Sequence, residues 1–175
     1  LMLTNGLRAG EVGRIDISDF DMNRGRIVLN IQRKGKVDKR DMVALPPMIG
    51  ELFEDYIGDR DFGADDPLII SHAYGGGGRR LAKVPISAIV KQRLRGIGIG
   101  RPDVTAHSLR HTCGSLLVES GADIETIRGM LGHTDTQTPR IYVEMAQQRR
   151  LLERSPSNIV AGLISKKAKK KRKRL

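Results

Sequence analysis

Residues 107–142 read HSLRHTCGSLLVESGADIETIRGMLGHTDTQTPRIY and combine helix signals with side chains suited to phosphate chemistry. His107 and Arg110 are three residues apart, so on a helix they share a face. His133 ends an LGH triplet, and Tyr142 follows nine residues later. A guanidinium, two imidazoles and a phenol at these offsets can act on a phosphate without a metal.

The first helix of this segment is bounded by clear signals. Thr105 is suited to be its N-cap, and Gly121 is suited to end it. The helix therefore carries both His107 and Arg110. Cys113 lies in its apolar run and is expected to be buried. As the only cysteine of the chain, it rules out an internal disulfide and fits a reducing compartment.

Two more helices are expected after it. Asp123 caps a short helix that ends at Gly132, and Thr138-Pro139 begins the next, because proline is favoured at the first helical position. Tyr142 then falls in the first or second turn of the last helix. A lone tyrosine there is more often a core aromatic than a nucleophile, so its position alone assigns no role.

The N-terminal residues 4–15, TNGLRAGEVGRI, predict a loop that opens into a short helix. Arg8 and Glu11 are three apart and share a face of that helix. The pair is either an exposed ion pair or part of a functional site, and this stretch alone favours the exposed pair. The residues expected to face the core are Leu7, Val12 and Ile15.

Residues 26–45 predict a β-hairpin. The first strand is RIVLNIQ, with alternating apolar residues, and the second is MVAL, which ends before two prolines. A charged hairpin tip is usually only solvated, but several cations around one turn could also reach into a DNA groove. The cations of this tip are Arg33, Lys34, Lys36, Lys39 and Arg40.

Further along, the pattern predicts amphipathic helices over 48–60 and 84–99 and a short buried strand at 67–71. The expected inward residues of the first helix are Met48, Ile49, Leu52, Phe53, Tyr56 and Ile57. Those of the second are Ile86, Ile89, Val90, Leu94 and Ile97. The whole chain is therefore expected to be mainly α with a small antiparallel β-sheet, an α+β fold within one ordinary domain length.

The formal net charge is +11, and the C-terminal tail supplies much of it. The last ten residues, KKAKKKRKRL, carry eight Lys or Arg and no acid, which leaves +3 for the rest. This tail is either solvated or a sequence-blind clamp on nucleic-acid phosphates. Aromatic content of 3% argues against a base-stacking platform for single strands. No apolar stretch approaches the roughly 18 residues that a membrane span needs.

Taken together, these motifs resemble the catalytic domain of tyrosine recombinases, the phage integrase family. The resemblance covers roughly residues 4–150. TNGLRAGE is similar to the family's first arginine box, TGLRxxE, and HSLRHT is similar to the second box, HxLRHT. LGH, with a tyrosine nine residues later, matches the remaining motif. Agreement of several motifs in order and spacing is far more specific than any one of them.

The resemblance implies a role for each matching residue. Arg8 and Arg110 hold the scissile phosphate, and His107 assists as acid or base. His133 hydrogen-bonds a phosphate oxygen, and Tyr142 is the nucleophile. No cofactor and no metal are expected.

A lysine of the hairpin is implied as the general acid for the 5′ hydroxyl. Counting from the first strand favours Lys34, and counting back from MVALP favours Lys36. We place Lys34 first and keep Lys36 as the alternative. Glu11 is expected to support Arg8.

The implied function is site-specific cleavage and rejoining of double-stranded DNA through a covalent 3′-phosphotyrosyl intermediate, without a metal. Four protomers are expected to assemble on two duplexes and exchange C-terminal segments. Neither a membrane nor a small-molecule substrate is expected as a partner. The expected location is the cytoplasm, with a bacterial or phage-encoded protein acting on chromosomal DNA.

The implied domain division places the catalytic domain at residues 1–154, in a chain from which an N-terminal DNA-clamping domain is expected to be missing. Residues 155–175 are expected to form a C-terminal segment with a short apolar helix and the basic tail. Two alternatives remain: a DNA-binding module of the same fold without catalysis, and a type IB topoisomerase-like strand-passage enzyme. The spacing between LGH and the tyrosine favours a recombinase over a topoisomerase.

Overall fold

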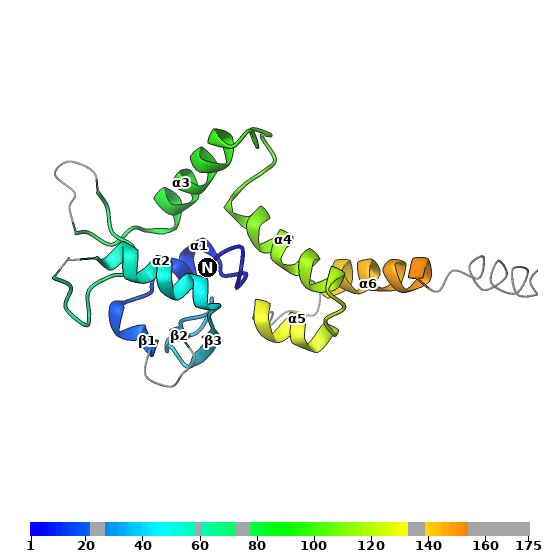
Figure 1. The fold of residues 1–175 in the computed structure, drawn as a ribbon, viewed down its shortest axis with the longest axis horizontal. Helices are drawn as coiled ribbons and strands as arrows, with labels where there is room; N and C mark the ends of the chain where they lie inside the picture. Colours follow the sequence, from blue (N-terminus) through cyan, green and yellow to red (C-terminus); the bar gives the residue numbers. More distant parts are fainter. Residues whose placement is uncertain (22–26, 59–60, 73–77, 133–138, 154–175) are drawn as a thin grey trace, which may run out of the picture.

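The computed structural model of the chain describes residues 1–21, 27–58, 61–72, 78–132 and 139–153. Its elements follow in the order α1 (Ala9–Val12), the 3-10 turn η1 (Ile17–Asp19), β1 (Phe20–Asp21), β2 (Val28–Ile31), β3 (Asp41–Ala44), α2 (Pro47–Ile57), α3 (Lys83–Gly96), α4 (Ala106–Glu119), α5 (Ile124–Leu131) and α6 (Pro139–Glu153). The predicted fold, mainly α with a small antiparallel sheet, is confirmed (Figure 1).

The sheet has three antiparallel strands in the order β1-β2-β3. β2 pairs with β3 from Val28 opposite Ala44 to Ile31 opposite Asp41, which confirms the hairpin. β1 is a strand that the sequence pattern did not predict. Its two residues carry too little alternation to stand out beside the turn-forming Asp and Asn residues around them.

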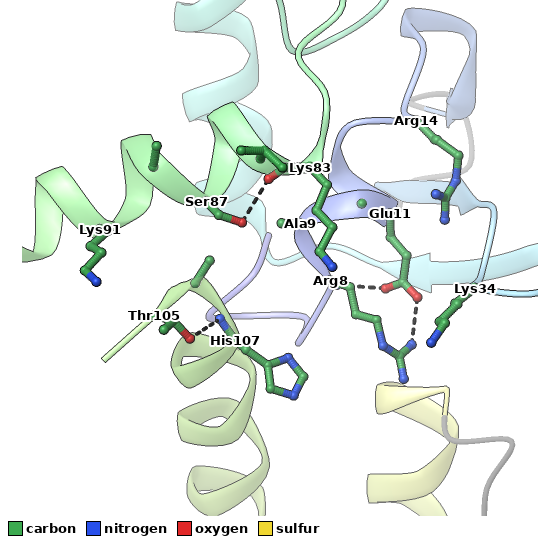
Figure 2. A pocket seen from close by; sticks show the side chains of 14 residues that line it. Arg8, Ala9, Glu11, Arg14, Lys34, Lys83, Ser87, Lys91, Thr105 and His107 are labelled. Carbon is green, nitrogen blue, oxygen red and sulfur yellow. Dashed lines mark hydrogen bonds and ion pairs between the residues drawn. The ribbon is translucent and has the colours of Figure 1, made fainter. Parts of the chain in front are cut away.

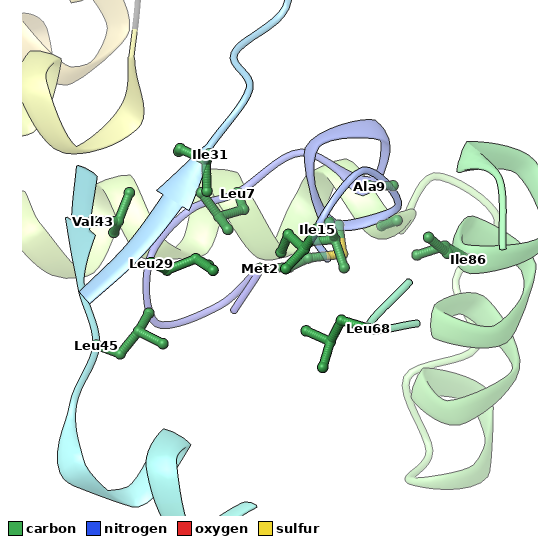
Figure 3. Packing of buried hydrophobic residues seen from close by; sticks show 12 residues of the cluster. Met2, Leu7, Ala9, Ile15, Leu29, Ile31, Val43, Leu45, Leu68 and Ile86 are labelled. Atoms are coloured by element: carbon green, nitrogen blue, oxygen red, sulfur yellow. The ribbon is translucent and has the colours of Figure 1, made fainter. Parts of the chain in front are cut away.

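The main hydrophobic core lies between the sheet, α1 and the start of α3. Leu29 and Ile31 point into it from β2, and Leu7 and Ile15 reach it from either side of α1 (Figure 3). Val12 is buried as well, so all three core residues predicted for the N-terminal segment are confirmed. This packing anchors α1, and therefore Arg8 just before it, on the sheet.

A second cluster joins α4, α5 and α6, which lie together at one side of the molecule (Figure 1). Its buried residues are Cys113, Val118, Ile127, Leu131 and Tyr142. The prediction that Cys113 is buried is therefore confirmed. Because the helix that carries Tyr142 packs against α4, the tyrosine lies close to the helix of His107 and Arg110.

The ends of α4 and α5 lie where the cap residues predict them. Thr105 Oγ1 accepts a hydrogen bond from the backbone N–H of His107 at 3.2 Å. Asp123 Oδ1 accepts one from the backbone N–H of Thr126 at 2.9 Å. Gly132 then ends α5 in the left-handed conformation, with φ 59°, a conformation that glycine adopts without strain.

Two predicted helices form but bury less apolar surface than their patterns suggest. In α2, Met48 and Leu52 are each 56% exposed instead of facing the core. In α3, Ile86 is buried, while Ile89 is exposed, and Ile97, which follows the last residue of the helix, is exposed as well. α3 packs against α1 and α4 and projects away from the sheet (Figure 1), so much of its length has no core to face.

The strand predicted at 67–71 is wrong. Two isolated bridges form there instead, one from Asp16 to Pro67 and one from Ile70 to Arg80. Leu68 is nevertheless buried, because its segment packs on the main core.

Thr138, predicted to cap the last helix, and residues 155–175 lie outside the described residues. The domain division at residue 154 therefore stays a prediction. Across the described parts of the chain, no helix combines the length and the apolar character that crossing a membrane requires.

Candidate active site

Arg8 lies just before α1 and is held by Glu11. Arg8 Nη1 donates to Glu11 Oε1 at 2.8 Å, and the backbone N–H of Arg8 donates to Glu11 Oε2, also at 2.8 Å. Glu11 is 1% exposed, so the pair is not the exposed ion pair that its spacing alone favoured. A carboxylate that binds both the backbone and the guanidinium of Arg8 fixes the direction in which this side chain points.

Arg33 reaches the same carboxylate from the hairpin. Its Nη1 lies 3.7 Å from Glu11 Oε2, and its Nη2 donates to the carbonyl of Met130 at 2.9 Å. Arg33 Nη1 also donates to the carbonyl of Leu131, at 3.4 Å. Arg33 is 5% exposed, and burial lowers the pKa of its guanidinium, although the charge of Glu11 opposes that shift. Arg33 therefore ties the hairpin to α1 and to the end of α5, which a solvated hairpin tip would not do.

The hairpin lysines point to different places. Lys34 is exposed and lines the same cleft as Arg8 and His107. Lys36 forms an ion pair with Asp41, with Nζ 2.7 Å from Oδ2, and lines a separate hollow. Of the two lysines left open by the sequence, the geometry therefore favours Lys34.

His107 lies in the first turn of α4, where the N-cap residue Thr105 fixes the start of the helix. Partial burial lowers the pKa of His107, and the neighbouring charges of His111 and Arg110 lower it further. A pKa below its usual value near 6.5 leaves this imidazole mainly neutral at pH 7. A bound phosphate would add negative charge beside the ring and raise that pKa again.

Arg110 lies one turn further along α4 and is 2% exposed. Its Nη1 donates to the carbonyl of Gly6 at 2.6 Å, and its Nη2 donates to the carbonyl of Leu131. Burial, followed by the charge of Arg8, lowers the pKa of Arg110 to about 10. The side chain remains charged at neutral pH, so it places a buried positive charge where the N-terminal segment, α4 and α5 meet.

Tyr142 packs against α4 and is 2% exposed. A Cβ atom at Gly114 would come within 2.5 Å of the tyrosine ring, so only glycine leaves room for it. The Tyr142 hydroxyl lies 3.1 Å from His111 Nδ1. Burial raises the pKa of Tyr142, and the charge of Arg110 offsets part of this effect. In this position the phenol is protonated and shielded from solvent, like the core aromatic that its pattern alone predicts.

His111 is the residue of this site to which sequence reasoning assigned no role. Its ring meets the ring of His107 edge to face, with centroids 4.7 Å apart, and its Nδ1 meets Tyr142. The signal was present in HSLRHT, where the two histidines are four residues apart and so occupy one face of a helix.

Arg8, Lys34 and His107 converge on one cleft of about 740 Å³ (Figure 2). Arg8 lies between the other two in this view. Arg110 and Tyr142 are not part of that lining. The remaining predicted residue, His133, lies outside the described residues.

The lining of this cleft is strongly positive. Among the described residues that form it, the charged side chains are Arg8, Arg14, Lys34, Lys83, Lys91 and Glu11. The first turn of α4 also faces the cleft and adds the partial positive charge of a helix N-terminus. A guanidinium, a mobile ammonium and an imidazole around one space can bind a phosphodiester and exchange protons with it.

The chain is similar to known proteins over most of its length. A profile of the phage integrase family matches residues 1–149. The tyrosine recombinase XerC of Corynebacterium glutamicum is 28% identical over 151 residues, which cover 86% of this chain and 46% of that protein. The tyrosine recombinase XerD of Lacticaseibacillus casei is 31% identical over 156 residues, covering 85% and 49%. The chain thus spans about half the length of the curated relatives it matches.

Solved structures share the fold. The XerH site-specific recombinase, bound to palindromic difH substrate in a post-cleavage complex, superposes with a TM-score of 0.68 at 25% identity, covering 90% of this chain and 44% of that one. The XerA recombinase gives a TM-score of 0.70 at 24% identity, covering 89% and 56%. These similarities confirm the fold that the motifs predict.

Proposed function

The chain belongs to the phage integrase family, and we propose that it cleaves and rejoins double-stranded DNA at specific sites. One observation carries this proposal. Arg8, Lys34 and His107, from three separate segments of the chain, line one positively charged cleft (Figure 2). The XerH recombinase was solved with its difH substrate, which supports a partner of the same class for this chain.

In the proposed reaction, Arg8 binds the scissile phosphate. Its planar guanidinium can donate two parallel hydrogen bonds to the non-bridging oxygens, and Glu11 keeps it in place. Arg110 supports the same phosphate through its buried charge, which stabilises negative charge that develops in the transition state. The family resemblance implies that His133 adds a hydrogen bond to a phosphate oxygen.

The chemical step that we propose is a transesterification. The Tyr142 oxygen attacks phosphorus and loses its proton to a base, while the bond from phosphorus to the 5′ oxygen breaks. Lys34 gives a proton to that leaving oxygen, and His107 acts as acid or base at the phosphate. The product is a 3′-phosphotyrosyl bond, which retains the energy needed for the reverse step to rejoin a strand. Charge stabilisation comes from the cationic side chains, so the proposal needs no metal.

The proposal also requires Tyr142 to move. In the structure its hydroxyl is buried and its pKa is raised, which is the opposite of what a nucleophile needs. Release of the ring from Gly114 on DNA binding would expose the hydroxyl. The exchange of C-terminal segments in a tetramer stays a prediction, because residues 155–175 lie outside the described part of the chain.

A DNA-binding module without catalysis is the second candidate, and the burial of Tyr142 is the observation that favours it. A pool of nicked suicide duplexes with randomised sequence separates the two. We expect the chain to form a denaturation-resistant protein–DNA adduct in the presence of EDTA, and Arg8→Gln to form far less. Tight binding without any adduct would support the second candidate and contradict the first.

A further inference from the structure

Arg33 continues the buried face of β2 into the hairpin loop. Leu29, Ile31 and Arg33 are buried in turn along the chain, and the residues between them are less buried. Successive side chains of an extended segment point to opposite sides, so Lys34 points away from the side that Arg33 buries. Figure 2 shows Lys34 at the cleft that it lines together with Arg8. Arg33 thus faces the interior, and its neighbour faces the cleft.

A β-turn that begins at Arg33 presents Lys34. The backbone N–H of Lys36 donates to the carbonyl of Arg33 at 3.1 Å, which closes the turn. Gly35, the third residue of the turn, has φ 84°, as a type II turn requires. Within the described parts of the chain, no hydrogen bond or ion pair holds the Lys34 ammonium. The place of Lys34 therefore depends on its backbone, and the turn fixes that backbone as long as residue 33 is held.

Two parts of the active site hold the Arg33 guanidinium. On one side, its Nη1 lies 3.7 Å from an oxygen of the Glu11 carboxylate that binds Arg8. On the other side, it donates to two carbonyls at the end of α5, and Arg110 donates to one of these, the carbonyl of Leu131. Arg33 is therefore placed relative to the supports of both phosphate-binding arginines.

The end of α5 has room for this side chain because residue 132 is glycine. A Cβ atom at Gly132 would lie 2.5 Å from Arg33 Nε, so any larger residue would displace the guanidinium. A planar guanidinium donates its hydrogen bonds in fixed directions. A buried charge is also costly to move away from its partners. The contacts of Arg33 therefore form a rigid anchor at the start of the turn.

We propose that Arg33 is a positioning residue for the reaction, whose buried guanidinium fixes the turn that presents Lys34 to the scissile phosphate. This inference rests on the proposed function, in which Lys34 is the general acid. Replacement of Arg33 leaves in place both hydrogen bonds between Arg8 and Glu11, so the loss is expressed at Lys34. A displacement of about 1 Å at a reacting group can slow a reaction by about 10²-fold.

Two leaving groups separate this role from a purely structural one. A duplex that the wild type selects from the randomised pool is made with an ordinary scissile phosphate or with a 5′-phosphorothiolate, whose phosphorus–sulfur bond breaks without a proton. We expect Arg33→Met to slow single-turnover cleavage of the ordinary duplex by about 10²-fold. We expect the same variant to cleave the phosphorothiolate duplex close to the wild-type rate. A loss of folded protein alone would slow both reactions equally.

Gly35→Ala tests the turn without changing the guanidinium. A Cβ atom at residue 35 meets nothing within 4 Å, so the strain comes only from the positive φ. We expect the same selective loss on the ordinary duplex. Circular dichroism melting shows whether each variant is folded, and Gly35→Ala decides the question if Arg33→Met is not.

Two control variants separate positioning from charge and from stability. Arg40 lies on the same hairpin in an exposed ion pair with Asp38, so Arg40→Met removes one charge and leaves the turn in place. Leu45 lies in the main core beyond the far end of β3, so Leu45→Ala destabilises the fold away from the turn. For both controls we expect the wild-type ratio of the rates on the two duplexes.

The inference and the proposed reaction fail in different ways. A wild type that forms the adduct, beside folded Arg33→Met and Gly35→Ala variants that keep its ratio of rates, would overturn the inference alone. Equal slowing of Arg33→Met on both duplexes would also overturn it, because Arg33 would then act only through the fold. A wild type that forms no adduct on any duplex would contradict the proposed reaction and the inference that rests on it.

Discussion

The Tyr142 hydroxyl lies 3.1 Å from His111 Nδ1, while the tyrosine ring covers Gly114 on the next turn of α4. This contact holds the proposed nucleophile against the helix that also carries His107 and Arg110. It keeps the hydroxyl out of the cleft, because Tyr142 is not among the residues that line that cleft. In the proposed reaction, the Tyr142 side chain must therefore leave this position before its hydroxyl can reach a phosphate in the cleft.

Gly114→Ala tests the packing of the ring. The added Cβ would meet the ring at 2.5 Å, so we expect the free energy of unfolding to fall by about 1–3 kcal/mol in urea titrations. Gly129→Ala on α5 is the control, because a Cβ there meets nothing within 4 Å. Alanine favours helix over glycine, so that variant should be unchanged or stabilised by up to about 1 kcal/mol. A loss of stability at residue 129 similar to that at residue 114 would contradict the steric account.

The pKa of Tyr142 makes stability depend on alkaline pH. Burial raises this pKa, so the folded state holds the proton more tightly than the unfolded state does. The stabilisation is complete below the unfolded pKa near 10 and is lost as the pH rises through the folded value. Urea titrations between pH 8 and 11 should show a steeper loss of stability for the wild type than for Tyr142→Phe. Parallel curves would show that the buried phenol does not titrate as proposed.

Arg33 should be important for the stability of the site. Arg33→Met removes its hydrogen bonds to Met130 and Leu131 and leaves Glu11 with one fewer positive neighbour. We expect a loss of about 2–4 kcal/mol in the free energy of unfolding, because a buried charge network is broken. The control is Arg40→Met, whose exposed ion pair with Asp38 should contribute less than about 1 kcal/mol. Equal effects of the two substitutions would mean that Arg33 does not tie the elements together.

The two hairpin lysines should differ in catalysis. Lys34 lines the cleft and is the proposed acid, so Lys34→Ala should slow DNA cleavage by about 10²–10⁴-fold. Lys36 is paired with Asp41 outside this cleft, and Lys36→Ala should have a small effect. A 5′-phosphorothiolate substrate, whose leaving group needs no proton, should restore the Lys34→Ala rate. Rescue of Lys36→Ala instead would reverse the assignment.

The parts of the fold that were predictable from sequence depend on local signals. Thr105 and Asp123 cap their helices by hydrogen bonds to residues two or three positions away, so the motif itself holds the information. Arg33 is different, because its partners on α5 are 97 and 98 residues away in the sequence. Nothing in a run of hairpin cations distinguishes a buried arginine from a solvated one.

The apolar pattern of the predicted helix at 84–99 overestimated burial, because burial depends on distant parts of the chain and not on local sequence. The apolar spacing of residues 84–99 predicts a helix correctly but not the extent of the core that it meets, and α3 projects past that core. In the candidate active site too, the residues in local motifs were predictable, and the contacts that depend on helix packing were not. Motif spacing identified Arg8 and His107, whereas the contact of His111 with Tyr142 depends on how α6 packs against α4.

Peptide mapping of the trapped adduct shows directly whether Tyr142 forms the covalent bond to DNA. After reaction with nicked suicide duplexes, nuclease and protease digestion leaves a short nucleotide on one peptide, which mass spectrometry identifies. We expect the modified peptide to contain Tyr142 and Tyr142→Phe to yield no adduct. A modified residue elsewhere, or an adduct that persists in Tyr142→Phe, would contradict it.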